Sequence, residues 1–266
     1  MWNLRSSYRK RRAFATFGAI WTLLLVSESA ISQSDQQVPS PDDRAALESP
    51  IVPVHHEPHH RQVFQFGPTR ILDMQVPPGD VSWFHTHEWP VLYMTLSQSA
   101  IRSQSPGSDW SGGAPRSGRP ERPPQETRPS PRATSFTAYF DKPSTHRIQN
   151  IGDSLFRAMV VVNETAGNDT QSVEQAGFDR EPELTNAWFR SYRVSLAPGE
   201  STDRHEHESP VVIFQAIDGK GRAHGPMDFE FNEPGQWAFY DRGVAHSIEN
   251  LGVEPIELLE IEVRLP

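Results

Sequence analysis

The chain has 266 residues, which is enough for one or two domains with cores of their own. Its formal net charge of −9 gives no basic excess for binding nucleic acid, so we expect no nucleic-acid partner. The absence of cysteine excludes disulfides, thiolate metal ligands and a cysteine nucleophile.

Residues 1–32 are predicted to be an export signal. A basic start that includes Arg11-Arg12 precedes an apolar run over 13–26, and small residues follow. The run is shorter than the roughly 20 residues of a membrane span, so we expect no span in the mature protein and a periplasmic or secreted location. The alternative is a retained N-terminal anchor. Arg11-Arg12 resembles the twin-arginine signal, a route for folded, cofactor-loaded proteins.

Residues 33–62 are predicted to be a linker, because they are polar and contain proline. The linker ends in a histidine-rich tract, His55-His56-Glu57-Pro58-His59-His60. We interpret this tract as a surface segment that leads into the first strand. The alternative is loose metal binding, which a histidine-rich composition also allows.

Short β-type runs separated by turn residues begin at residue 63 and predict an all-β chain. The runs cover 70–76, 81–87, 91–96, 134–140 and 155–162, then 188–196, 201–207, 211–217, 237–240 and 256–263. Residues 97–134 are rich in proline, arginine, serine and glycine, and we predict a disordered insert there. The polar residues 163–186 are predicted to link two domains.

Two sequence elements recur in the same order, which indicates an internal duplication. His85-Thr86-His87-Glu88 returns 120 positions later as His205-Glu206-His207-Glu208, and His146 with Asn150 returns 100 positions later as His246 with Asn250. We therefore predict two domains, over 63–162 and 187–266.

The repeated histidines have the spacing of a metal site. In a strand, side chains at i and i+2 lie on one face, so each His-x-His pair can converge on one ion. A third histidine from another strand would complete a facial set with open positions. The predicted metal ligands are His85, His87 and His146 in the first copy and His205, His207 and His246 in the second. The alternative for any single histidine is a hydrogen-bonded core residue.

These motifs resemble the cupin signature. Gly79 to His87 and Gly199 to His207 match its Gly-x5-His-x-His half, and His146 with Asn150 and His246 with Asn250 match His-x3-Asn. The resemblance implies a bicupin of two double-stranded β-helix (jelly-roll) barrels, each with a metal pocket.

The family's common glutamate ligand, four or five residues after the second histidine, is absent. Valine or leucine stands there. Glu88 and Glu208 are expected on the outer face or in a turn, with metal ligation through a β-bulge as the alternative. The resemblance then implies a three-histidine site like those of cupin thiol and diketone dioxygenases, which use iron(II). Imidazole ligands alone also suit Zn, Mn, Ni or Cu. We further expect Trp83, Tyr93, Asp203 and Tyr240 to line the pockets, with core packing as the alternative for the tyrosines.

The sequence leaves three functions open. The first is metal-dependent oxidation, of dioxygenase type, of a small chelating organic substrate. The second is non-catalytic binding of a small ligand or metal, and the third is a metal-dependent isomerase or lyase. The partner expected in each case is a small molecule, and exposed barrel edges together with the family resemblance also lead us to expect a homodimer.

Overall fold

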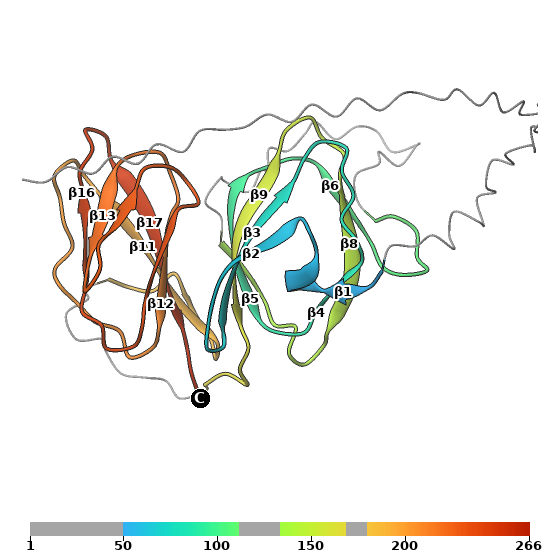
Figure 1. Cartoon of the computed structure of the whole chain (residues 1–266), viewed down its shortest axis with the longest axis horizontal. Coiled ribbons are helices and arrows are strands. Elements are labelled where there is room, and N and C mark those ends of the chain that lie inside the picture. Colours follow the sequence, from blue (N-terminus) through green and yellow to red (C-terminus); the bar gives the residue numbers. More distant parts are fainter. Residues whose placement is uncertain (1–49, 112–133, 169–179) are drawn as a thin grey trace, which may run out of the picture. The chain divides into compact units, whose positions relative to one another are not determined.

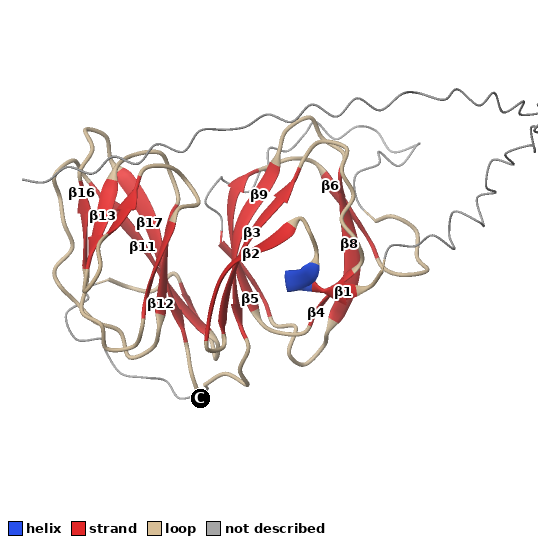
Figure 2. Ribbon diagram, in the orientation of Figure 1, coloured by secondary structure: helices blue, strands red, loops and turns tan. Residues whose placement is uncertain are grey.

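The computed structural model describes residues 50–111, 134–168 and 180–266, all of which belong to one compact unit. The predicted export signal, residues 112–133 of the predicted insert and residues 169–179 of the predicted link lie outside these ranges. In the described part of the chain the single helical element is the short 3-10 helix η1 (Val54–His56), and the rest is strand and loop (Figures 1 and 2). Within the same ranges no helix is long and apolar enough to cross a membrane.

The first barrel consists of two sheets. The larger has the strand order β2-β3-β9-β5-β7 and the smaller β1-β4-β8-β6 (Figure 1). The strands are β1 (Val52–Pro53), β2 (His60–Phe66), β3 (Thr69–Val76), β4 (His85–His87), β5 (Val91–Ser97), β6 (Ile101–Gln104), β7 (Thr134–Thr137), β8 (Ser144–Asn150) and β9 (Phe156–Asn163).

The larger sheet of the second barrel repeats the topology of the first. It has the order β10-β11-β17-β12-β15, and the smaller sheet has the order β14-β13-β16. The strands are β10 (Leu184–Thr185), β11 (Phe189–Leu196), β12 (Val211–Gln215), β13 (Gly221–His224), β14 (Phe229–Phe231), β15 (Trp237–Tyr240), β16 (Ser247–Asn250) and β17 (Ile256–Val263). The matching strand orders of the two larger sheets are the structural counterpart of the sequence repeat.

The larger sheets are buried on both faces, which explains their continuous apolar runs. Val91 and Val211 face the interiors of their own barrels. Their neighbours Leu92 and Val212 point to the opposite face and join one apolar cluster that draws on strands of both barrels. Successive side chains in a strand alternate between faces, so a two-sided burial requires apolar residues at every position.

The turn after each third histidine has the same structure in both barrels. The Asn150 side chain donates hydrogen bonds to the carbonyls of Val76 and Ser154 and accepts one from the amide of Gly152. Asn250 makes the equivalent bonds to Leu196, Glu254 and Gly252. Both asparagines therefore stabilise the turn that follows the third histidine.

Ordered structure extends into segments that the sequence assigned elsewhere. Residues 52–62, placed in the linker, form β1, η1 and the start of β2. Residues 101–104, placed in the insert, form β6, which pairs with β8. The largely polar composition of both segments did not indicate strands, because an edge strand needs few apolar side chains.

Candidate metal centre

The second barrel brings its three repeated histidines together in its interior. His205 and His246 face each other across a β-bridge and exchange two backbone hydrogen bonds of 2.9 and 2.8 Å. His207 lies two residues on, just before β12. All three side chains are buried, and their ring centroids lie 4.4–5.3 Å apart.

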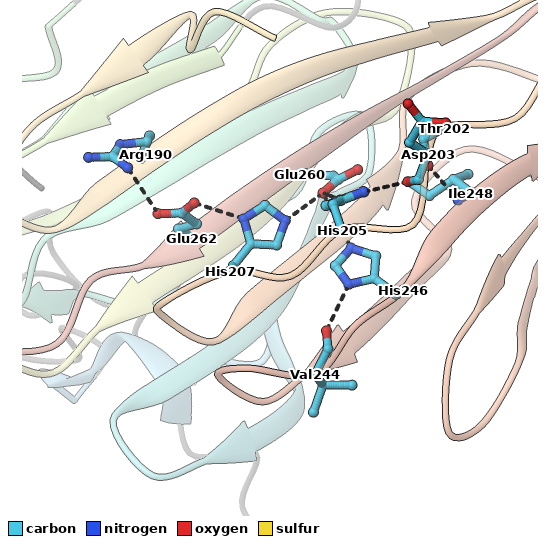
Figure 3. Close-up of polar contacts among 10 residues, drawn as sticks. All are labelled: Arg190, Thr202, Asp203, His205, His207, Val244, His246, Ile248, Glu260 and Glu262. Atoms are coloured by element: carbon cyan, nitrogen blue, oxygen red, sulfur yellow. Dashed lines mark hydrogen bonds and ion pairs between the residues drawn. The ribbon is translucent and has the colours of Figure 1, made fainter. Parts of the chain in front are cut away.

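The Nδ1 atoms of these imidazoles all have an acceptor. His205 Nδ1–H donates to the carbonyl of Asp203 at 2.9 Å, and His246 Nδ1–H donates to that of Val244 at 3.2 Å. His207 Nδ1–H donates to Glu262 Oε1 at 2.8 Å (Figure 3). Because a proton occupies each Nδ1, each Nε2 is the atom left to act as a ligand.

The three Nε2 atoms converge on one carboxylate oxygen. Glu260 Oε2 lies 3.2 Å from His205 Nε2, 3.0 Å from His207 Nε2 and 3.4 Å from His246 Nε2 (Figure 3). Glu260 comes from β17 and is fully buried, and its Oε1 has no hydrogen-bond partner among the described residues.

This donor set fits a divalent cation. Neutral imidazoles protonated at Nδ1 direct three lone pairs at a carboxylate oxygen, and acceptors that face one another repel unless a proton or a cation lies between them. Around a six-coordinate ion with bonds of about 2.1 Å, adjacent donor atoms lie about 3.0 Å apart, close to the separations from Glu260 Oε2. A set of three histidines and one glutamate suits Mn, Fe, Zn and related ions.

Without a cation, protons separate the facing acceptor atoms of this donor set, and the pKa values of Glu260 and His207 reflect this. Burial alone would raise the pKa of Glu260, but hydrogen bonds from the three imidazoles hold it well below its usual range. Burial would lower the pKa of His207, but hydrogen bonds to Glu260 and Glu262 raise it to about 9. His207 is therefore the imidazole that carries the extra proton at neutral pH.

An outer ion pair orients His207. Glu262, on the same strand as Glu260, accepts from His207 Nδ1 and lies 3.8 Å from an Arg190 guanidinium nitrogen. Such outer carboxylates fix the ring of a ligating histidine and increase its basicity.

The first barrel collects four histidines. His85 and His146 face each other in the β4–β8 ladder, and their ring centroids lie 4.7 Å apart. His87 stacks on His146 at 5.0 Å. His60, from β2, joins them with its centroid 4.3 Å from that of His85. One ring nitrogen from each of His60, His85 and His87 lies within 4.8 Å of the others.

Burial keeps His85, His87 and His146 neutral. Burial lowers the pKa of His85 to about 3 and that of His146 to about 4, with further lowering by the neighbouring His60 in both cases. The pKa of His87 is well below its usual value for the same main reason. Neutral imidazoles retain the lone pairs that a metal requires.

The two centres differ because the last strands differ. Val160 and Val162 occupy in β9 the positions that Glu260 and Glu262 occupy in β17. The first barrel consequently lacks both the inner and the outer carboxylate, and His87 Nδ1 has no hydrogen-bond partner among the described residues.

The two expected three-histidine sets are both changed in the structure. Glu260 adds a carboxylate to the second set, and in the first barrel the converging group is His60, His85 and His87 rather than His85, His87 and His146. Glu88 and Glu208 are exposed, as expected. The signal for Glu260 was present in Glu257-Leu258-Leu259-Glu260-Ile261-Glu262, where acidic residues alternate within an apolar strand.

Two of the four expected pocket residues lie elsewhere. Trp83 is 40% exposed, and the Asp203 side chain is also exposed. The expectation extended strand alternation back from the histidines, but β4 begins only at His85, and His205 forms an isolated bridge. Both residues instead contribute backbone carbonyls, which accept from the Nδ1 of His85 and of His205.

One of the two expected tyrosines contacts a centre. Tyr240 stacks on His246 with 4.7 Å between ring centroids, and its hydroxyl donates to the carbonyl of Ala223. Burial raises the pKa of Tyr240 to about 12. Tyr93 packs against the core of the first barrel. Tyr139, which the sequence did not single out, stacks on His87 at 4.6 Å.

The approaches to the two centres differ in size. A cleft of about 390 Å³ beside His207 is lined by Asn168, Arg242, Glu262 and Arg264 among other residues. The corresponding cavity beside His87 measures only about 30 Å³, and Pro53, Val54 and His55 line it.

Comparison with known proteins supports the fold. No family model matches the chain. Over 73 residues it is 34% identical to an oxalate-binding protein of Thermotoga maritima, a match that spans 27% of this chain and 60% of the relative. The crystal structure of AerE from Microcystis aeruginosa superposes with a TM-score of 0.54 at 14% identity, over 76% of this chain and 90% of that one. A cupin 2 conserved barrel domain protein from Leptotrichia buccalis gives a TM-score of 0.43 at 14% identity, over 76% and 87%.

The chain has a fold of two jelly-roll barrels. The duplicated barrels and their interior histidine clusters are the features that the sequence signature implied. The chain carries two metal-type donor sets of different charge, one with an inner glutamate and one composed of imidazoles.

Proposed function

We propose that the second barrel of this chain holds a divalent metal and uses it to bind a small chelating carboxylate, with oxalate as the first ligand to test. The observation that carries this proposal is the convergence of three imidazole Nε2 atoms on Glu260 Oε2. His205, His207, His246 and Glu260 would hold the ion. When bound, the ion supplies positive charge and open coordination positions to a ligand.

The protein residues set the number and charge of these positions. Four protein donors leave two positions on a six-coordinate ion, the number that a bidentate carboxylate occupies. A single glutamate neutralises only half of a divalent charge, so the centre favours an anionic ligand. The cleft beside His207, with its Arg242 and Arg264 guanidinium groups, is an approach of suitable size.

Oxalate is chosen because the Thermotoga maritima relative is named an oxalate-binding protein. The match spans 60% of that relative, so its ligand enters here as part of the proposal. Its name favours binding over turnover, which is the second function that the sequence left open.

A catalytic form of the proposal is metal-dependent oxidation of the same ligand class, with iron(II) tested first. Oxygen uptake on ligand addition would support this dioxygenase-type reaction. Turnover without oxygen uptake would support an isomerase or lyase, and tight binding without turnover would support a binding protein.

Calorimetry tests the proposal. The chain, purified without chelator and loaded with manganese or iron(II), should bind oxalate, and His207→Ala should abolish binding in the second barrel. Acetate, which cannot form the same chelate, should bind much more weakly. Equal affinity for oxalate in the metal-loaded and metal-free protein would contradict the proposal.

We also propose that the chain is exported and that it forms a homodimer. Mass spectrometry of the N-terminus of the protein recovered from the cell envelope tests export, because cleavage near residue 32 is the expected result. Light scattering of the purified chain tests the dimer.

A further inference from the structure

The segment from Val52 to His60 is built into the wall of the first barrel. β1 pairs in parallel with β4, and the amide of Val52 donates to the carbonyl of Phe84 at 3.0 Å (Figure 1). Val54, at the start of η1, is buried in the core of this barrel. Beyond Val54, residues 55–60 are histidines, a glutamate and a proline, so the ordered position of this part of the segment needs another source of stability.

A buried carboxylate in the segment orients His60. Glu57 is 1% exposed and accepts hydrogen bonds from the amide of Trp83 at 3.1 Å and from His60 Nδ1 at 2.6 Å. Because His60 Nδ1 carries the donated proton, its Nε2 is left with a lone pair for a ligand. This is the carboxylate–histidine arrangement that Glu262 and His207 form in the other barrel.

The neighbouring imidazoles present nitrogens without partners. His85 Nδ1 donates to the carbonyl of Trp83, and its Nε2 is buried with no hydrogen-bond partner among the described residues. His87 Nδ1 is likewise buried and unpartnered. Buried polar atoms almost always have partners, so two such nitrogens beside His60 require an explanation.

His60 takes the place of the glutamate that this barrel lacks. Val160 stands at the position of Glu260, and no carboxylate belongs to the group of donors that converge here. The same segment also fills the approach, because the cavity that Pro53 and Val54 line measures about 30 Å³. That is close to the volume of one water molecule in the liquid, about 30 Å³.

We infer that the first barrel holds a divalent metal in an all-imidazole site, with His60 as a ligand alongside His85 and His87, and that this metal fixes the segment 52–60 in place as a permanent cover. The centre is then closed to substrates and stabilises the fold, which leaves the second barrel as the open one. This inference concerns different residues from the proposed function and does not depend on ligand binding there.

The test isolates the first barrel in the full chain that carries His207→Ala. Zinc is the probe, because imidazole ligands suit it. Competition with a chromophoric chelator should give one equivalent of zinc. Adding His60→Ala should lower the affinity by more than the roughly 10- to 100-fold typical for loss of an outer-shell partner. His56→Ala is the matched control, since His56 is exposed in the same segment. It should leave the affinity unchanged.

Hydrogen exchange measured on the His207→Ala chain, with His60 intact, gives an independent readout. Zinc should slow exchange of the amides of Val52, Glu57 and His60, which donate within or from the segment. In the chain with both His207→Ala and His60→Ala, zinc should leave this exchange unchanged. The inference is overturned if no zinc binds, if His60→Ala and His56→Ala have equal effects, or if zinc does not slow exchange over 52–60.

Discussion

Replacing Glu260 with glutamine isolates the charge of the second centre, because the side chain keeps its shape. In the metal-free protein Glu260 accepts a hydrogen bond from the protonated His207 at 3.0 Å in a fully buried position. Charge-assisted hydrogen bonds contribute about 1.5–3 kcal/mol. For a domain of this size, that loss lowers the melting temperature by about 3–12 °C.

The same substitution should reduce metal affinity in a graded series. His85→Ala removes metal binding in the first barrel. In that background Glu260→Gln removes an anionic ligand and should lower the metal affinity of the second centre by more than about 100-fold. Glu262→Gln removes only the hydrogen-bond partner of His207 Nδ1 and should lower the metal affinity by about 10- to 100-fold. Glu206→Gln is the control, because Glu206 is exposed beside His207. It should have no effect.

Competition titration with a chromophoric chelator measures the series, and thermal melts of the metal-free proteins measure stability. The reasoning would be refuted if Glu260→Gln bound metal as well as Glu206→Gln does. It would also fail if Glu262→Gln weakened binding more than Glu260→Gln, since the outer carboxylate would then be the more important one.

The contacts of His207, the two turn asparagines and Tyr240 lead to further predictions. The raised pKa of His207 stabilises the metal-free fold below pH 6.5, and this contribution is lost as the pH rises through about 9. Metal must displace that proton, so the affinity of the second centre should rise about tenfold per pH unit between pH 6.5 and 9 in calorimetry. Asn250→Ala and Asn150→Ala should each lower the free energy of unfolding, measured in urea, by about 2–4 kcal/mol. Each substitution removes three hydrogen bonds in equivalent turns. A large difference between the two variants would contradict the equivalence of the turns. Tyr240→Phe should lower the free energy of unfolding by about 1 kcal/mol, because it removes the hydrogen bond of the hydroxyl to Ala223. It should leave the metal content unchanged, since the ring still stacks on His246.

The sequence predicted the fold because its signals were local and repeated. His-x-His fixes two side chains on one strand face, and the second occurrence 120 residues later makes coincidence a poor explanation. The strand runs such as Val91–Leu96 were readable from β-branched and apolar residues alone.

The missing ligands depend on pairing that a single sequence does not display. Glu260 reaches His205 only because β17 pairs with β12, in the register that sets Glu260 opposite Ile213. His60 reaches His85 only because the preceding segment folds back onto β4. Trp83 and Asp203 were misplaced because alternation applies only within a strand, and the strand does not extend to them.

The decisive measurement is the metal content of the full chain, purified without added chelator or metal. We expect close to two equivalents of divalent metal per chain, with one equivalent lost in His207→Ala and the other lost in His87→Ala. An unchanged content in His207→Ala would contradict the assignment of the second barrel as a metal centre. A metal-free chain that also takes up no metal on reconstitution would contradict the account as a whole.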